Sequence, residues 1–216
     1  MTQANLQREI RVFLSSTFRD MDAELKAYFY NTLSVLTQKT HNPELAKASM
    51  EQMLENLFNQ GEAGMEILVV TLSNMAQQLN VDGKTERALE FYQKAKVAAL
   101  QPPRDPAVLA NIIMQIAQIK AQNGNSAEAE QHLQEAVTLI EEMPPTPQRQ
   151  IMLSSCYQEL ATVYLVEKNF VSAAVLYDRA ISAVKTIYSS DATEMRKLEE
   201  NRDLFHRLAQ EHGQTA

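Results

Sequence analysis

Three segments of the chain repeat one pattern of small and bulky positions without gaps: residues 86–99, 127–140 and 171–184. In each, a small residue is followed four positions later by a bulky one, and three positions after that by alanine. Residues at i, i+4 and i+7 share one face of an α-helix. The pattern therefore predicts three helices whose buried face lets a neighbouring helix approach closely. These positions are Ala88, Tyr92 and Ala95, then Ala129, Leu133 and Ala136, then Ala173, Tyr177 and Ala180.

A second helix is predicted upstream of each copy. Five residues before the first small position lie Gly83, Gly124 and Lys168, within stretches whose composition is typical of tight turns. Seven residues before each turn position stands an alanine that follows an apolar residue. The equal offsets indicate three helix–turn–helix units. The upstream pairs are Met75 and Ala76, Ile116 and Ala117, and Leu160 and Ala161.

This arrangement resembles the tetratricopeptide repeat (TPR), whose signature alternates small and aromatic residues across two antiparallel helices. Tyr164 and Tyr177 keep the family's aromatic residues, Lys120 and Leu133 depart from them, and no tryptophan is present. The resemblance covers residues 66–188 and implies an all-α fold, a right-handed α-solenoid of helix hairpins. Leu72, Ile113 and Tyr157 occupy the family's usual tryptophan position.

The repeats follow one another at intervals longer than the family's usual period of about 34 residues. The excess lies between repeats, where proline cannot continue a helix interior but is tolerated in a first turn. Long-period arrays of this kind resemble those of kinesin light chains and nephrocystin-type proteins. We expect Pro102, Pro103, Pro144 and Pro145 to end second helices, and Pro106 and Pro147 to begin first helices.

The C-terminal part, residues 189–216, is predicted to be a capping helix. Asp191 is placed to be its N-cap, and Glu194 three residues later is placed to complete a variant of the capping box. One apolar stripe on an otherwise charged helix suits a cap over the last repeat better than a dimerising coiled coil. The stripe consists of Met195, Leu198, Phe205 and Leu208.

The N-terminal segment, residues 1–40, carries a second resemblance. Ile10 to Leu14 is predicted to be a short strand, and IRVFLSSTFRDMDAE is similar to the opening of an SSTFRDM-type domain of unknown function with a TIR-like fold. We interpret it as a truncated domain or a start that pairs with another chain. Residues 41–65 are expected to form a leading helix, with Gly61 and Gly64 separating it from the first full repeat. One interpretation makes this helix half of a degenerate repeat.

Composition narrows the function. A formal net charge of −7 opposes broad electrostatic binding of nucleic acid. Five glycines are too few to favour a glycine-rich loop that binds phosphate. One cysteine excludes an intrachain disulfide framework, and the four histidines form no metal-ligand pair at helical spacing. Ser15 to Thr17 suits helix capping better than catalysis. We therefore expect a non-enzymatic cytoplasmic protein with no cofactor or metal, and with no nucleic-acid or membrane partner.

The TPR resemblance implies that the first helix of each repeat lines a groove that binds a protein or peptide. The expected function is a protein-interaction adaptor or scaffold, and binding of acidic C-terminal tails is disfavoured because the groove positions lack Lys and Arg. A solvated face, a TIR-like nucleotide-related signalling activity at the N-terminus and a self-assembling homo-oligomer are the alternatives. The groove positions are Val70, Ser73, Gln77 and Asn80, then Asn111, Met114, Gln118 and Ala121, then Ser155, Gln158, Thr162 and Leu165.

Overall fold

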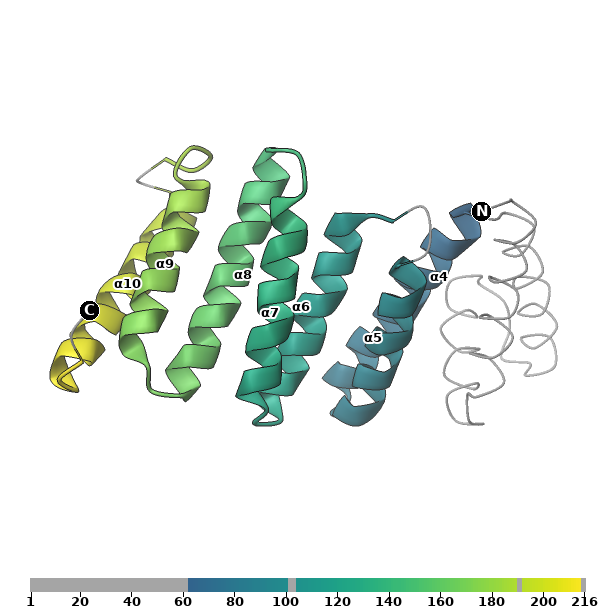
Figure 1. The fold of residues 1–216 in the computed structure, drawn as a ribbon, viewed down its shortest axis with the longest axis horizontal. Coiled ribbons are helices and arrows are strands. Elements are labelled where there is room, and N and C mark those ends of the chain that lie inside the picture. Colours follow the sequence, from purple (N-terminus) through teal and green to yellow (C-terminus); the bar gives the residue numbers. More distant parts are fainter. Residues whose placement is uncertain (1–61, 101–103, 190–191, 215–216) are drawn as a thin grey trace. The chain divides into compact units, whose positions relative to one another are not determined.

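The computed structural model of the chain describes residues 62–100, 104–189 and 192–214 (Figure 1). These residues form seven α-helices and contain no strand. The chain divides into two compact units, Met1–Pro103 and Arg104–Ala216. The predicted strand and the TIR-like start lie outside the described residues.

Consecutive helices pack as pairs joined by short turns. In the first unit, α4 (Glu62–Val81) packs on α5 (Thr85–Ala99). In the second, α6 (Pro106–Gln122) packs on α7 (Ser126–Glu141), α8 (Pro147–Val166) on α9 (Phe170–Val184), and α9 also on α10 (Thr193–Glu211). The two hairpins of the second unit meet through contacts of α8 with both α6 and α7. The prediction of an all-helical repeat fold is confirmed.

The small positions of the repeat pattern are the most deeply buried part of each hairpin. All nine predicted alanines have an exposed fraction of 0%. Because an alanine side chain extends little beyond the backbone, a second helix packs against it at short range, and the adjacent bulky residues fill the remaining space. The nine are Ala76, Ala88, Ala95, Ala117, Ala129, Ala136, Ala161, Ala173 and Ala180.

The three predicted turns share one backbone conformation. Gly83 and Gly124 have φ of 76° and 81°, and Lys168 at the equivalent position has φ of 57°. In the third turn the Lys168 N–H donates to the Leu165 carbonyl, and the Asn169 N–H donates to the Tyr164 carbonyl. The same pair of hydrogen bonds closes the other two turns, and together they form the Schellman motif that ends many helices.

The prolines mark helix starts as the sequence predicts. Pro106 and Pro147 are the first residues of α6 and α8, and Asp105 and Thr146 cap them. The Asp105 carboxylate accepts hydrogen bonds from two backbone N–H groups, and the Thr146 hydroxyl accepts one. Such caps satisfy N–H groups that have no partner within the helix. Pro144 and Pro145 follow the end of α7, whereas Pro102 and Pro103 lie outside the described residues.

Two predicted helix boundaries are wrong. Gly64 lies inside α4 rather than before it, since one helical glycine costs only about 1 kcal/mol relative to alanine. The N-cap of α10 is Ala192, which makes no side-chain cap, and not Asp191, which lies outside the described residues. The buried stripe of α10 includes Met195, Leu198 and Phe205 as predicted, but Ala209 is buried in place of the half-buried Leu208.

The end of α10 holds the turn between α8 and α9. Gly213, with φ of 65°, ends α10 in a fourth Schellman motif and places Gln214 after it. The Gln214 side chain donates to the Lys168 carbonyl at 2.7 Å and accepts from the Phe170 N–H at 3.0 Å. Gln214, which follows the last helix, thus supplies a hydrogen-bond partner to the Lys168 carbonyl and to the Phe170 N–H of this turn.

No helix in the described part of the chain combines the length and apolar character needed to cross a membrane.

Candidate functional site

The predicted groove residues are all accessible to some extent. Gln77, Asn111 and Thr162 are exposed, as is Ser155, and the remaining polar positions are half-buried. Val70 and Leu165 are exposed by 54% and 37%. None of these positions belongs to the buried core. The half-buried positions are Ser73, Asn80, Met114, Gln118, Ala121 and Gln158.

The predicted positions of the second unit lie on α6 and α8. These two helices contact each other in the second unit, and the spacing of the predicted positions places them on one face of each helix. We call this set the first-helix face: Asn111, Met114 and Gln118 of α6 with Ser155, Gln158 and Thr162 of α8. Ser73, Gln77 and Asn80 lie on α4, which belongs to the first unit.

The polar groups on α8 are hydrogen-bonded along their own helix. The Gln158 side-chain amide donates to the Ser154 carbonyl at 3.3 Å, and the Thr162 hydroxyl donates to the Gln158 carbonyl at 3.1 Å. Both bonds join residues four apart, and the groups that make them lie at or near the surface. Because such local bonds are replaceable by bonds to a ligand at small net cost, these side chains can turn to a bound chain.

The few basic side chains of the first helices are occupied. α4 has no Lys or Arg, α6 has only Lys120 and α8 has only Arg149. The Lys120 ammonium lies 2.7 Å from the Glu128 carboxylate on α7, and Arg149 Nε donates to the Ile140 carbonyl at 3.1 Å. The Glu128 pKa is lowered, first by the hydrogen bond from Lys120 and then by its charge.

Glu159 is the one acidic residue of α8. It is half-buried, and this burial raises the pKa of its carboxyl group above the usual value. No described hydrogen bond or ion pair in the structure involves its side chain. A carboxyl group in this setting favours its neutral form more than an exposed one does.

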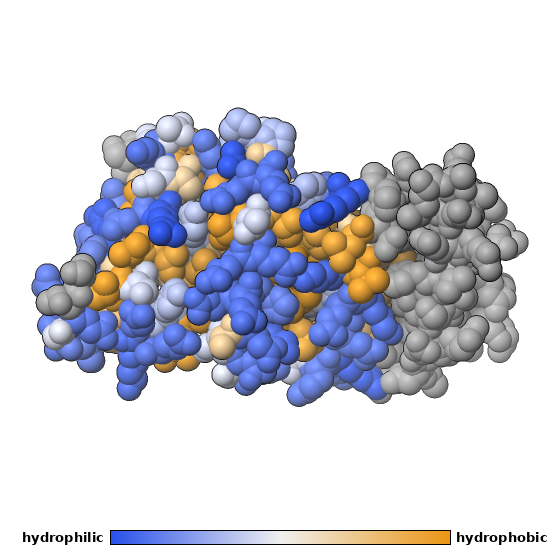
Figure 2. All heavy atoms as spheres, viewed as in Figure 1, coloured by the Kyte–Doolittle hydropathy of each residue, from blue (hydrophilic) through white to orange (hydrophobic). Residues whose placement is uncertain are grey.

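Charged residues are more numerous on α5 and α7 than on the first helices of the same hairpins. α5 carries charged residues of both signs, α7 carries four glutamates, and α9 carries Asp178 and Arg179. Figure 2 shows a hydrophilic surface over α7 with hydrophobic residues visible beside it. The two sides of the α6–α7 hairpin therefore differ in charge, whereas α8 and α9 each carry one acidic and one basic residue.

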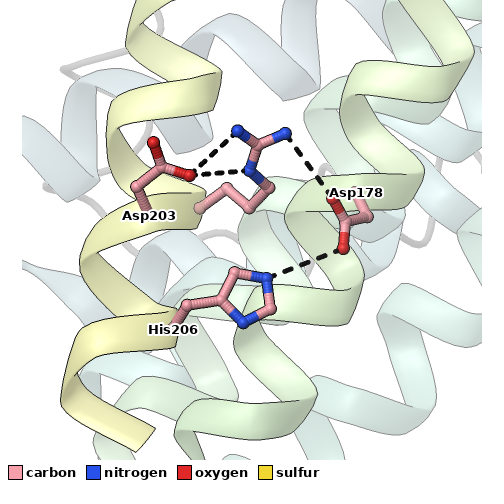
Figure 3. Close-up of polar contacts among 4 residues, drawn as sticks. Asp178, Asp203 and His206 are labelled. Carbon is pink, nitrogen blue, oxygen red and sulfur yellow. Dashed lines mark hydrogen bonds and ion pairs between the residues drawn. The ribbon is translucent and has the colours of Figure 1, made fainter. Parts of the chain in front are cut away.

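A polar cluster joins α9 and α10 (Figure 3). Asp178 on α9 lies 3.9 Å from both Arg202 and His206 on α10, and Arg202 also contacts Asp203 at 2.9 Å. The two aspartates are more than half exposed, so these pairs contribute little to stability. Below them Tyr177 stacks on Phe205 with 5.3 Å between ring centroids. The cluster is best explained as the polar rim of the α9–α10 contact.

The single cysteine does not have the environment of a nucleophile. Cys156 is fully buried, and its Sγ donates to the Leu133 carbonyl at 3.4 Å. Burial, with a smaller contribution from Glu159, raises the pKa of the thiol to about 12. Reactive cysteines have lowered pKa values and are accessible, so Cys156 packs α8 against α7. In the described ranges no three residues of metal-binding type gather.

Sequence reasoning missed the contacts between hairpins. The Tyr164 hydroxyl of α8 donates to Glu130 of α7, and this hydrogen bond is the largest cause that raises the Tyr164 pKa to about 12. Lys120, which stands at the equivalent position of α6, instead contacts Glu128 within its own hairpin. Lys120 and Tyr164 both occupy the repeat position where the family has an aromatic residue. The repeat pattern therefore identified this position, but it did not predict which residue the side chain there contacts.

Comparison with known proteins gives the fold. No family model matches the chain, and no curated protein matches it significantly. Among solved structures, the crystal structure of BtubC (BKLC) from P. vanneervenii is similar, with 16% sequence identity and a TM-score of 0.59. The match covers 96% of this chain and 82% of that one. It supports a TPR-like helical repeat fold and does not support the TIR-like start.

Proposed function

We propose that this chain is a non-enzymatic adaptor that binds a segment of a partner protein through its first helices. The observation that carries the proposal is the first-helix face itself. Six residues on the adjacent helices α6 and α8 expose amide, hydroxyl and thioether groups instead of being buried in the hairpin core. Amides and hydroxyls both donate and accept hydrogen bonds, as binding of an extended backbone requires.

The fold favours the same function. Stacked helical hairpins create extended surfaces on which a partner chain can lie across several repeats. In the TPR family the first helices line that surface, and Ser73, Gln77 and Asn80 hold the corresponding positions of α4 in the first unit. Those three residues are part of the proposal.

The test is capture of binding partners by paired variants. Gln118→Ala with Gln158→Ala removes two side-chain amides from the first-helix face. Gln131→Ala with Gln134→Ala removes two exposed amides from α7, including one that makes a bond along its own helix as Gln158 does. Both double variants make the same chemical change and have the same helix propensity cost.

We expect the wild-type chain and the α7 variant to retain the same proteins from a cell extract, identified by mass spectrometry. The first-helix variant should lose most of them, while circular dichroism shows unchanged helix content in all three proteins. Equal capture by the two double variants would refute binding through the first-helix face.

A further inference from the structure

We infer that the first-helix face selects an uncharged peptide segment with apolar side chains, rather than an acidic one. This inference rests on the proposed function and names the chemistry of the partner. It follows from the contacts that engage the basic side chains of α6 and α8, and from the exposed apolar residues of α8.

The first-helix face has no free basic group to offer an acidic ligand. Lys120 and Arg149 are the only basic residues of α6 and α8, and both are engaged by α7, through Glu128 and through the Ile140 carbonyl. Releasing Lys120 for an acidic ligand would exchange one ion pair for another with little net gain.

The face has apolar groups at both ends of its polar stripe. On α8, Ile151 and Leu165 are exposed by 39% and 37%, and between them at helical spacing lie Ser155, Gln158 and Thr162. Fourteen residues of helix cover about 21 Å, which an extended segment of about six residues can span. Amides and hydroxyls in the middle suit a peptide backbone, and the two ends suit apolar side chains.

An acidic peptide would lose hydration on this face without gaining a partner. Burying an ionised group without a counter-charge is costly, whereas an uncharged segment exchanges water for amide hydrogen bonds and apolar contacts. The salt concentration should therefore have little influence on the affinity, because no ion pair forms on binding.

The experiment uses the full chain as bait for a displayed library of random peptides of about twelve residues, long enough for the six-residue span and its flanks. The most enriched peptide is then synthesised with a fluorescent label, and its Kd is measured by anisotropy at about 50 mM and about 500 mM salt. Two charged variants are compared: Gln118→Lys with Gln158→Lys on the face, and Gln131→Lys with Gln134→Lys on α7. Gln118→Ala with Gln158→Ala provides a face variant that adds no charge.

We expect enriched peptides of near-zero net charge that carry apolar residues, with a Kd that changes less than about twofold between the two salt concentrations. Both face variants should weaken binding by about tenfold or more, and the α7 variant by less than about twofold. Enrichment of charged peptides, or a Kd that rises steeply with salt, would overturn the inference.

The outcomes separate this inference from the proposed function. If charged peptides are enriched and the face variants abolish their binding, the proposed function stands and the inference fails. If the α7 variant weakens binding as much as the face variants do, the proposed function itself fails. An absence of any enriched peptide also overturns the inference, because a short uncharged segment is then insufficient for binding.

Discussion

Replacing Lys168 by glycine should stabilise the second unit, although the substitution removes a side chain. Lys168 occupies the turn position that Gly83 and Gly124 hold in the other hairpins, and its φ of 57° is in the left-handed region. A residue with a Cβ is strained there, whereas glycine is not. Gly124→Ala is the reverse change at the equivalent position of the neighbouring hairpin.

The magnitude follows from two opposing effects. The left-handed conformation costs a non-glycine residue about 1–2 kcal/mol, and glycine makes the unfolded chain more flexible at a cost of about 0.4–1 kcal/mol. Lys168→Gly should therefore stabilise by about 1 kcal/mol. A Cβ added at Gly124 meets no atom within 4 Å, so Gly124→Ala should destabilise by a similar amount through backbone strain alone.

Urea unfolding followed by far-ultraviolet circular dichroism measures both changes. With a typical slope of about 2 kcal/mol per molar urea, each substitution should move the midpoint by about 0.5 M, in opposite directions. The double variant should fall near the wild type if the two turns act independently. A lower midpoint for Lys168→Gly would refute the argument that strain decides the residue preferred at this turn.

Three further outcomes are expected. Ala117→Leu should destabilise the protein by about 1–3 kcal/mol because this alanine of α6 is fully buried. Ala127→Leu on the exposed side of α7 should change the stability by less than about 0.5 kcal/mol. Thermal melts that show equal losses for the two variants would contradict the packing argument. Gln214→Ala removes both hydrogen bonds to the α8–α9 turn and should cost about 1 kcal/mol, seen as faster amide exchange in that turn and unchanged exchange in α6. Because the pKa of Tyr164 is raised to about 12, the stability from its bond to Glu130 is fully present below about pH 10 and is lost as the pH rises toward 12. Tyr164→Phe should flatten this dependence of stability on pH. A spectrophotometric tyrosinate titration that detects no group with a raised pKa would disprove the prediction.

Several features could be predicted because they depend on neighbours in the chain. The spacing of alanines within one helix determines which face a neighbouring helix can approach closely, and all nine predicted alanines are buried. The offset from each turn to its flanking helices is short, so the turns at Gly83, Gly124 and Lys168 were also predicted correctly. Proline placed the starts of α6 and α8 for the same local reason. The predicted break at Gly64 was wrong, because the cost of a helical glycine was too small to interrupt α4.

Other features were decided only by the tertiary structure. Gln214 reaches Lys168 across 46 residues, and Tyr164 reaches Glu130 across 34, so neither contact leaves a periodic signal. The same is true of the uncharged character of the first-helix face. The sequence supplies Lys120 and Arg149 on α6 and α8, and only the packing of α7 against those helices engages both side chains. Helical periodicity specifies which side of a helix is buried, whereas the partner of an individual side chain depends on how separate helices pack in space.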